Sequence, residues 1–248
     1  MRPGAGGVVT GKVAIITGAS QSISVGLIAG YRARGWAVAA SAHTIEPCGD
    51  ADVLTVAGDI ADPGTADRIV RGALGRFGRL DTLVNNASAL ISKPFTDYTA
   101  DDYATIVGVN LAGFFWLTQR AIAEMAMRYG GHVVNVSATL AGAADPATPA
   151  VLAALTRGGI VAATRSLALE YAGLGIRVNA VSAGLIETPS QSADSREGVG
   201  DRLPPLGRVG QIRDAVDGVL FLESSPYITG EILYVDGGQI AGHSGPVV

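Results

Sequence analysis

The stretch Val-Ala-Ile-Ile-Thr-Gly-Ala-Ser-Gln-Ser-Ile-Ser at residues 13–24 decides the fold. Its first five residues form a short apolar run, which is typical of a strand buried on both faces of a sheet. The residues that follow the turn, 23–34, predict a helix that ends at Gly35. Backbone amides at the N-terminus of such a helix can hold a phosphate group. We therefore expect a buried strand followed by an anion-binding turn.

The same alternation continues along the chain. Further strands are predicted at 37–41, 53–57, 82–85, 132–137, 176–181 and 231–235, with helices at about 62–77, 101–128, 151–171 and 213–223. Strands separated by helices form right-handed crossovers and hence a parallel sheet covered on both faces. The sequence predicts one α/β domain over residues 1–248, a doubly wound (Rossmann) sheet of about seven strands, with its ligand beyond the carboxyl ends of the strands.

One segment breaks this periodicity. Residues 189–206 are rich in Ser, Gly and Pro, and a loop of this length inside a compact domain is usually a lid over a ligand. A plain surface loop is the alternative. We expect a lid.

Composition narrows the functional classes. The 248 residues are 48% hydrophobic and 16% charged, with a net charge of −4, which excludes disorder and argues against nucleic acid as a partner. No 18-residue apolar run occurs and residues 1–11 lack a signal-peptide pattern, so we expect a cytoplasmic protein with no membrane partner. The single cysteine excludes an internal disulfide, and the three scattered histidines predict no metal site.

Further motifs follow the first turn in a fixed order. They are Gly58-Asp59-Ile60, Asn85-Asn86-Ala87, Val109-Asn110, the segment 177–188 and the segment 229–238. Together with the turn after the first strand, they resemble the short-chain dehydrogenase/reductase family over nearly the whole chain. The resemblance implies an NAD(P)-dependent oxidoreductase that acts on a small carbonyl or alcohol substrate.

The resemblance also implies a set of cofactor-binding residues. The family's second and third turn glycines are replaced here by Ser22 and Ser24, and each serine adds a Cβ and a hydroxyl. The hydroxyls either donate to a phosphate or fill the turn and exclude the cofactor. The implied residues are Gly18, Ser20, Ser22, Ile23, His43, Asp59, Ile60, Asn86, Ala87, Gly184, Ile186 and Thr188.

The end of the second predicted strand bears on the choice between NAD and NADP. The family's NAD-specific members usually carry an acid near the position of Ala42, and none stands there. The arginine that usually accompanies NADP is also missing, and His43 is a cation only part of the time. The residues at this strand end favour NADP over NAD as the cofactor.

The family's catalytic Tyr and Lys are absent. Residues 164–170 resemble the end of the family's active-site helix, and counting back places Ala153 at the Tyr position and Arg157 at the Lys position. No Tyr lies between Tyr129 and Tyr171. Alanine cannot exchange a proton, and the pKa of an arginine is too high for proton exchange near neutrality.

Other side chains are implied in catalysis by the resemblance. Asn110 matches a helix-borne Asn of the family, and either Ser137 or Thr139 can present a hydroxyl, with Thr139 slightly favoured. Arg157 can bond ribose hydroxyls or a substrate carboxylate. Asp145 is an alternative acid, although a turn residue is the simpler interpretation.

Three functions therefore stay open. The first is an oxidoreductase with an altered proton donor. The alternatives are a catalytically silent ligand-binding protein and a non-redox enzyme such as a dehydratase, isomerase or cyclase. The partner expected in each case is a small molecule, and the resemblance implies a homodimer or homotetramer paired through the helices at about 101–128 and 151–171.

Overall fold

A computed structural model describes residues 11–20, 22–139, 142, 149–188 and 203–242. These residues form one seven-stranded parallel sheet in the order β3-β2-β1-β4-β5-β6-β7. The strands are β1 (Val13–Thr17), β2 (Ala37–Ala42), β3 (Val53–Ala57), β4 (Thr82–Asn85), β5 (Gly131–Ala138), β6 (Ile176–Ala183) and β7 (Ile232–Val235). The strand order reverses between β1 and β4, which is where doubly wound sheets bind ligands. The predicted fold class is confirmed.

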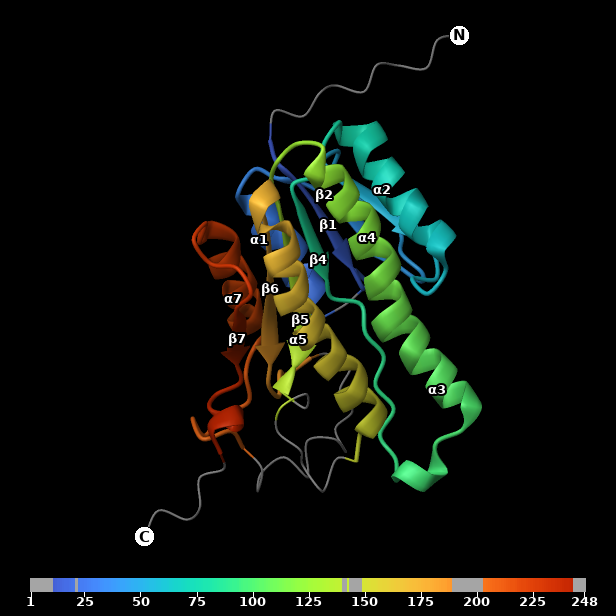
Figure 1. Ribbon diagram of the computed structural model, residues 1–248, viewed down its shortest axis with the longest axis vertical. Helices are drawn as coiled ribbons and strands as arrows, with labels where there is room; N and C mark the ends of the chain where they lie inside the picture. Colours follow the sequence, from blue (N-terminus) through green and yellow to red (C-terminus); the bar gives the residue numbers. More distant parts are fainter. Residues whose placement is uncertain (1–10, 21, 140–141, 143–148, 189–202, 243–248) are drawn as a thin grey trace.

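Helices cover both faces of this sheet (Figure 1). One face carries α2 (Pro63–Phe77), α4 (Gly113–Ala126) and α5 (Val151–Tyr171), and the other carries α1 (Ile23–Ala33) and α7 (Ile212–Ser224). Two buried apolar clusters, one on each face, hold these layers against the strands. Short 3₁₀ turns occur at Phe95–Asp97, Ala172–Leu174 and Gln239–Ala241.

The helix expected at 101–128 is interrupted. It consists of α3 (Ala100–Val107), a π-helical segment η2 (Gly108–Ala112) and α4. The π segment surrounds Asn110, whose buried side chain bonds the backbone of Ala89. Wide turns of this kind are rare and occur mostly as single insertions at functional sites.

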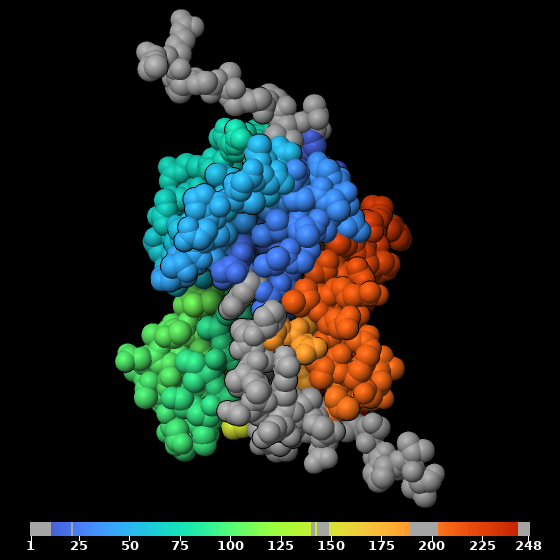
Figure 2. Space-filling view, turned by 180° about the vertical axis from the view of Figure 1, so that it is seen from behind, coloured from blue at the N-terminus to red at the C-terminus, as the bar shows by residue number. Residues whose placement is uncertain are grey.

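Local sequence accounts for the ends of several helices. Asp62 caps α2 by accepting a hydrogen bond from the Gly64 amide, Pro63 occupies the first turn, and Gly78 ends the helix with a φ of 78°. On the opposite face, α1 packs closely on α7 because Gly26 has no side chain: a Cβ there would lie 2.9 Å from a methyl group of Val216. Figure 2 shows the two chain regions side by side.

The helix from Ala100 to Ala126 has a mean hydropathy of 1.2 over its most apolar 18-residue window and is long enough to cross a membrane by length alone. In the fold it forms a layer of the domain, because buried side chains such as Leu117 and Met125 belong to the core between helices and sheet. A core helix of this kind satisfies the same length and hydropathy test.

Candidate active site at the reversal of strand order

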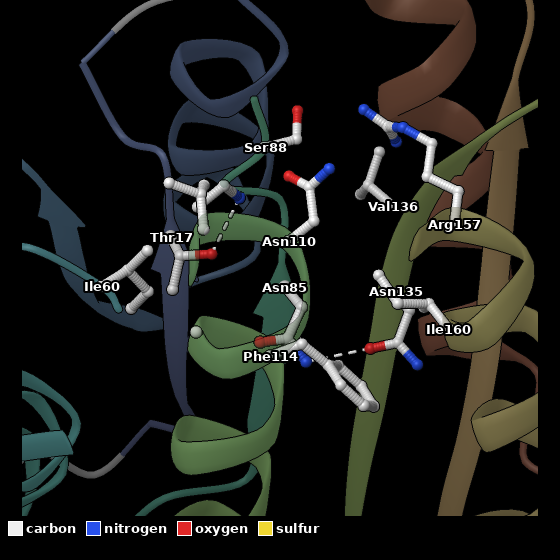
Figure 3. Close-up of a pocket in the computed structure, with 13 residues that line it drawn as sticks. Thr17, Ile60, Asn85, Ser88, Asn110, Phe114, Asn135, Val136, Arg157 and Ile160 are labelled. Carbon is white, nitrogen blue, oxygen red and sulfur yellow. Dashed lines mark hydrogen bonds between the residues drawn. The ribbon is translucent and has the colours of Figure 1, made fainter. Parts of the chain in front are cut away.

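A cleft opens at the point where the strand order reverses (Figure 3). Its wall comes from the ends of β1, β4 and β5, from the π segment and from α5. Polar and apolar side chains alternate around it. The lining residues are Thr17, Ile60, Asn85, Ala87, Ser88, Val109, Asn110, Gly113, Phe114, Asn135, Val136, Arg157 and Ile160.

The ends of β1 and β4 are joined by Thr17. Its hydroxyl oxygen accepts hydrogen bonds from the backbone amides of Asn86 and Ala87, both at 3.0 Å. The Asn86 side chain donates to the Thr17 carbonyl at 3.1 Å. Gly18 has a φ of 67°, and a Cβ there would lie 2.9 Å from the Cα of Ala87. The structure thus brings Gly18, Asn86 and Ala87 together, and glycine is needed at position 18.

In the turn after β1, Ser22 adopts a backbone conformation with positive φ that glycine normally occupies. Ser22 has φ 63° and ψ −131°, values that normally require glycine at the first central position of a type II′ turn. The buried Ser24 hydroxyl donates to the Gly18 carbonyl at 2.7 Å, so it closes the turn from inside. Ser20 is exposed and Ile23 begins α1.

This turn fits a phosphate group. The Ser22 side chain makes no capping hydrogen bond to α1, and the first turn of α1 contains no acidic residue. The amide groups and the positive end of the helix dipole therefore face the turn without a competing carboxylate. The residues present at the N-terminus of α1 are compatible with a dinucleotide pyrophosphate.

The residues expected on the adenine side lie at the carboxyl ends of β2 and β3. His43 is exposed directly after β2, and the Gly58 amide donates to the Ala42 carbonyl at 3.0 Å, which joins the two strand ends. The exposed Asp59 carboxylate accepts from the Ala61 amide at 2.9 Å and so fixes the turn. Ile60 extends from this turn into the cleft.

The segment after β6 lies beside the cleft and not in its wall. The Gly184 amide donates to the Val235 carbonyl at 3.0 Å, and a Cβ at Gly184 would lie 2.6 Å from the Cα of Asp236. Ile186 is buried and bridges to Gly210. Thr188 ends the described part of this segment. Gly184, Ile186 and Thr188 are near one another but apart from the lining residues.

Asn110 is fully engaged by the protein. Its Oδ1 accepts from the Ala89 amide at 2.7 Å, and its Nδ2 donates to the Ala89 carbonyl at 3.0 Å and to the Thr156 hydroxyl at 3.1 Å. The side chain therefore ties the chain after β4 to the π segment and to α5. Asn110 lines the cleft as expected, and it shapes the wall.

The two hydroxyl alternatives differ in their surroundings. The Thr139 hydroxyl donates to Asp236 Oδ2 at 3.3 Å, and Thr139 does not line the cleft. The Ser137 hydroxyl is buried and has no hydrogen-bond partner among the described residues. Ser137 does not line the cleft either, so the two residues differ in that the Thr139 hydroxyl is bonded to Asp236 and the Ser137 hydroxyl has no partner among the described residues.

Arg157 provides the only charge among the described residues that line the cleft. Its Nε is buried and has no hydrogen-bond partner among the described residues, and burial lowers the pKa of the guanidinium below its usual range. Ala153, one turn earlier on α5, is completely buried. Asp145 lies outside the described residues, as do residues 189–202 of the expected lid.

The sequence reasoning missed a polar network on the floor of the cleft. The Asn85 side chain donates to Thr118 Oγ1 and to Asn135 Oδ1, both at 2.9 Å, and Asn135 Nδ2 donates to Thr164 Oγ1 at 2.9 Å. The network joins β4, β5, α4 and α5 below the cleft. Its signal was available, because both asparagines stand near the carboxyl end of an apolar strand.

Comparisons with known proteins agree with this geometry. The family model described as enoyl-(acyl carrier protein) reductase matches residues 18–239. The chain is 31% identical over 245 residues to the 3-oxoacyl-(acyl carrier protein) reductase FabG of Thermotoga maritima, covering 93% of this chain and 98% of the relative. It is 33% identical over 252 residues to the 2-(R)-hydroxypropyl-CoM dehydrogenase of Xanthobacter autotrophicus, covering 93% and 99%. The protein belongs to the short-chain dehydrogenase/reductase family.

Solved structures show the same fold. The ligand-free aldohexose dehydrogenase of Thermoplasma acidophilum is similar with a TM-score of 0.85 and 25% identity, covering 97% of each chain. The structure titled ElxO with NADP bound has a TM-score of 0.84 and 24% identity, covering 94% of this chain and all of that one. At family level the protein is an oxidoreductase.

Proposed function

We propose that the protein is an NAD(P)-linked oxidoreductase that acts on a small carbonyl or alcohol substrate in this cleft. The observation that carries the proposal is the continuity between the turn at the N-terminus of α1 and the cleft, which share the Thr17–Gly18 strand end. A nicotinamide cofactor, when bound, would supply or accept the hydride. The protein's own residues bind and orient the two reactants.

Specific residues would hold the cofactor. The amides at the start of α1 would face the pyrophosphate, while Asp59 and Ile60 would border the adenine. No acid follows β2 to accept from a ribose 2′-hydroxyl, and exposed His43 stands at that strand end. These features support NADP over NAD as the cofactor.

Proton transfer sets the expected rate. None of the described residues that line the cleft is an Asp, Glu, His, Cys, Lys or Tyr, and the guanidinium of Arg157 cannot act as an acid near neutrality. We infer that solvent supplies the proton to the substrate oxygen. Turnover should then be about 10²–10⁴-fold slower than with a positioned side-chain acid.

The test is a calorimetric titration with NADPH and NADH, followed by the loss of reduced-nicotinamide absorbance on addition of carbonyl compounds. The proposal expects binding, tighter for NADPH, and slow oxidation of the cofactor. Absence of binding for both cofactors would refute it.

A catalytically silent ligand-binding protein is the second candidate. The inward Ser24 hydroxyl and the buried alanine at position 153 favour it, because both replace groups that the family uses for cofactor or proton. This candidate predicts that the protein binds the cofactor but does not oxidise it when carbonyl or quinone acceptors are added.

We also propose that the protein is a homo-oligomer. The outer faces of α4 and α5 expose large apolar side chains: Phe115 is 51% exposed, Leu155 65% and Leu169 84%. The sequence Val161-Ala162-Ala163 on α5 leaves room for a second helix to approach. A second copy of the chain that pairs through these helices would cover this surface.

A further inference from the structure

The guanidinium of Arg157 faces the cleft, and no acidic residue in the described part of the chain forms an ion pair with it. Arg157 extends from α5 past Val136 toward the side of the cleft that Ser88 and Asn110 line (Figure 3). No ion pair joins Arg157 to an acid within the described part of the chain, and its Nε is enclosed without an acceptor. Buried cations in proteins are normally paired, because removing a charge from water is costly.

The protein side of the cleft offers no counter-charge. The other described lining residues are amides, hydroxyls or apolar side chains, and none is an aspartate or glutamate. Asn110, which also lines the cleft, already donates to Ala89 and Thr156. A negatively charged ligand in the cleft would balance the charge of Arg157.

A second unsatisfied group lies on the strand that α5 covers. Ser137 stands two residues after Asn135 on β5, so the two side chains share the face on which Asn135 bonds Thr164 of α5. The Ser137 hydroxyl is buried and unpartnered among the described residues, like the Nε of Arg157. Facing elements thus hold two donors without acceptors at the ligand end of the sheet.

We propose that Arg157 binds the carboxylate of the substrate, so that the substrate is a short oxo acid or hydroxy acid. A carboxylate is planar, carries one negative charge and accepts two parallel bonds from a guanidinium. One arginine among apolar walls such as Ile60, Phe114 and Ile160 balances a monoanion and leaves a phosphate dianion undercompensated. Ribose hydroxyls would be neutral and would leave the charge unbalanced.

The oxo or hydroxy group of the substrate rests on the proposed function, because it is the group that an oxidoreductase would reduce or oxidise. The carboxylate site does not depend on that function and can be tested by binding alone. The probes are acetoacetate and acetoacetamide, which differ only in the charged oxygen replaced by an amino group. Calorimetric titrations use the full chain with and without NADPH. Wild-type protein should bind acetoacetate about 10- to 100-fold more tightly than the amide, as expected for a charge-assisted hydrogen bond.

The variants assign the effect to one side chain. Arg157→Gln should remove the preference for acetoacetate and leave acetoacetamide binding unchanged. Arg157→Lys should keep only part of the preference, because an ammonium keeps the charge but cannot make the two parallel bonds. Arg165→Gln is the matched control, because Arg165 is an exposed arginine on the same helix. If Arg157→Gln does not fold, Arg157→Lys and the wild-type comparison of the two probes still decide the question.

The outcomes separate this inference from the proposed function. Equal binding of the two probes to wild-type protein, or binding of neither, overturns the carboxylate site. Loss of NADPH binding in Arg157→Gln with acetoacetate preference retained also overturns it and assigns Arg157 to the cofactor. A charge-dependent acetoacetate site without any NADPH oxidation supports the site and refutes the oxidoreductase.

Discussion

Ser22 adopts a backbone conformation that serine resists, and its replacement by glycine gives a quantitative test of the turn. A φ of 63° with a ψ of −131° brings the serine Cβ into conflict with its own backbone, and such residues cost about 1–3 kcal/mol. Glycine adopts the same conformation without that conflict, but it loses about 0.5–1 kcal/mol through its greater freedom in the unfolded chain. Ser22→Gly should therefore raise the free energy of unfolding by roughly 0.5–2 kcal/mol.

Chemical denaturation followed by circular dichroism measures this difference. For a domain of this size the corresponding rise in Tm is roughly 1–8 °C. Ser20→Gly is the matched control, since Ser20 lies in the same turn, is exposed and has no positive φ. That control should lose about 0.4–1 kcal/mol. A Ser22→Gly protein that is no more stable than wild type, with Ser20→Gly behaving as expected, would refute the reasoning about strain.

The same variant also tests the cofactor turn. Removal of the Ser22 Cβ lets the backbone approach a pyrophosphate, so NADPH should bind more tightly to Ser22→Gly than to wild-type protein. Unchanged NADPH affinity in a stabilised variant would show that position 22 does not contact the cofactor.

Three further perturbations test other parts of the molecule. Burial lowers the pKa of His132 below its usual 6.5, so this group makes the fold less stable as the pH falls below about 6.5. Burial raises the pKa of Glu223, but its hydrogen bonds leave that pKa below 4.5, so its contribution is lost only at pH values below about 4.5. Urea unfolding between pH 7 and pH 5 should therefore show the slope that His132 causes, and His132→Gln, but not exposed His43→Gln, should flatten it. Asn110→Ala removes three hydrogen bonds from a buried side chain and should lower the free energy of unfolding by about 1–3 kcal/mol in the same assay, whereas no loss would mean that water replaces those bonds. Leu155→Arg places a charge on the exposed apolar face of α5 and should shift the protein to monomer in analytical ultracentrifugation, and an unchanged mass would exclude that face as the interface.

The buried network around His132 explains why the pH dependence has this sign. His132 Nδ1 lies 3.1 Å from Glu223 Oε2, and Nε2 faces the donors Arg177 Nη1 at 3.3 Å and Asn179 Nδ2 at 3.1 Å. The neutral ring with its proton on Nδ1 satisfies all of these contacts. A second proton on Nε2 would point at two donors, so the folded protein resists protonation that the unfolded chain accepts.

The sequence by itself determined the architecture. Short apolar runs such as 13–17 and 82–85, separated by helical periods, are typical of a parallel sheet with helices on both faces, which the structure confirms. The order of the strands in that sheet came only from the structure. The prediction that Ala153 and Arg157 stand where the family has its Tyr and Lys also came from the sequence, because it depends on residue identity and spacing. Helix ends such as Asp62-Pro63 were also local in origin.

Only the tertiary structure decided what the remaining polar side chains do. The Thr139 hydroxyl donates to Asp236, 97 positions further along the chain, and the Asn110 side chain is hydrogen-bonded to Ala89 and Thr156. No local sequence pattern indicates these partners. The interruption of the long helix at Asn110 likewise depends on these contacts. The buried Nε of Arg157, which has no partner among the described residues, could be found only in the structure, because burial and hydrogen bonding depend on how α5 packs against β5.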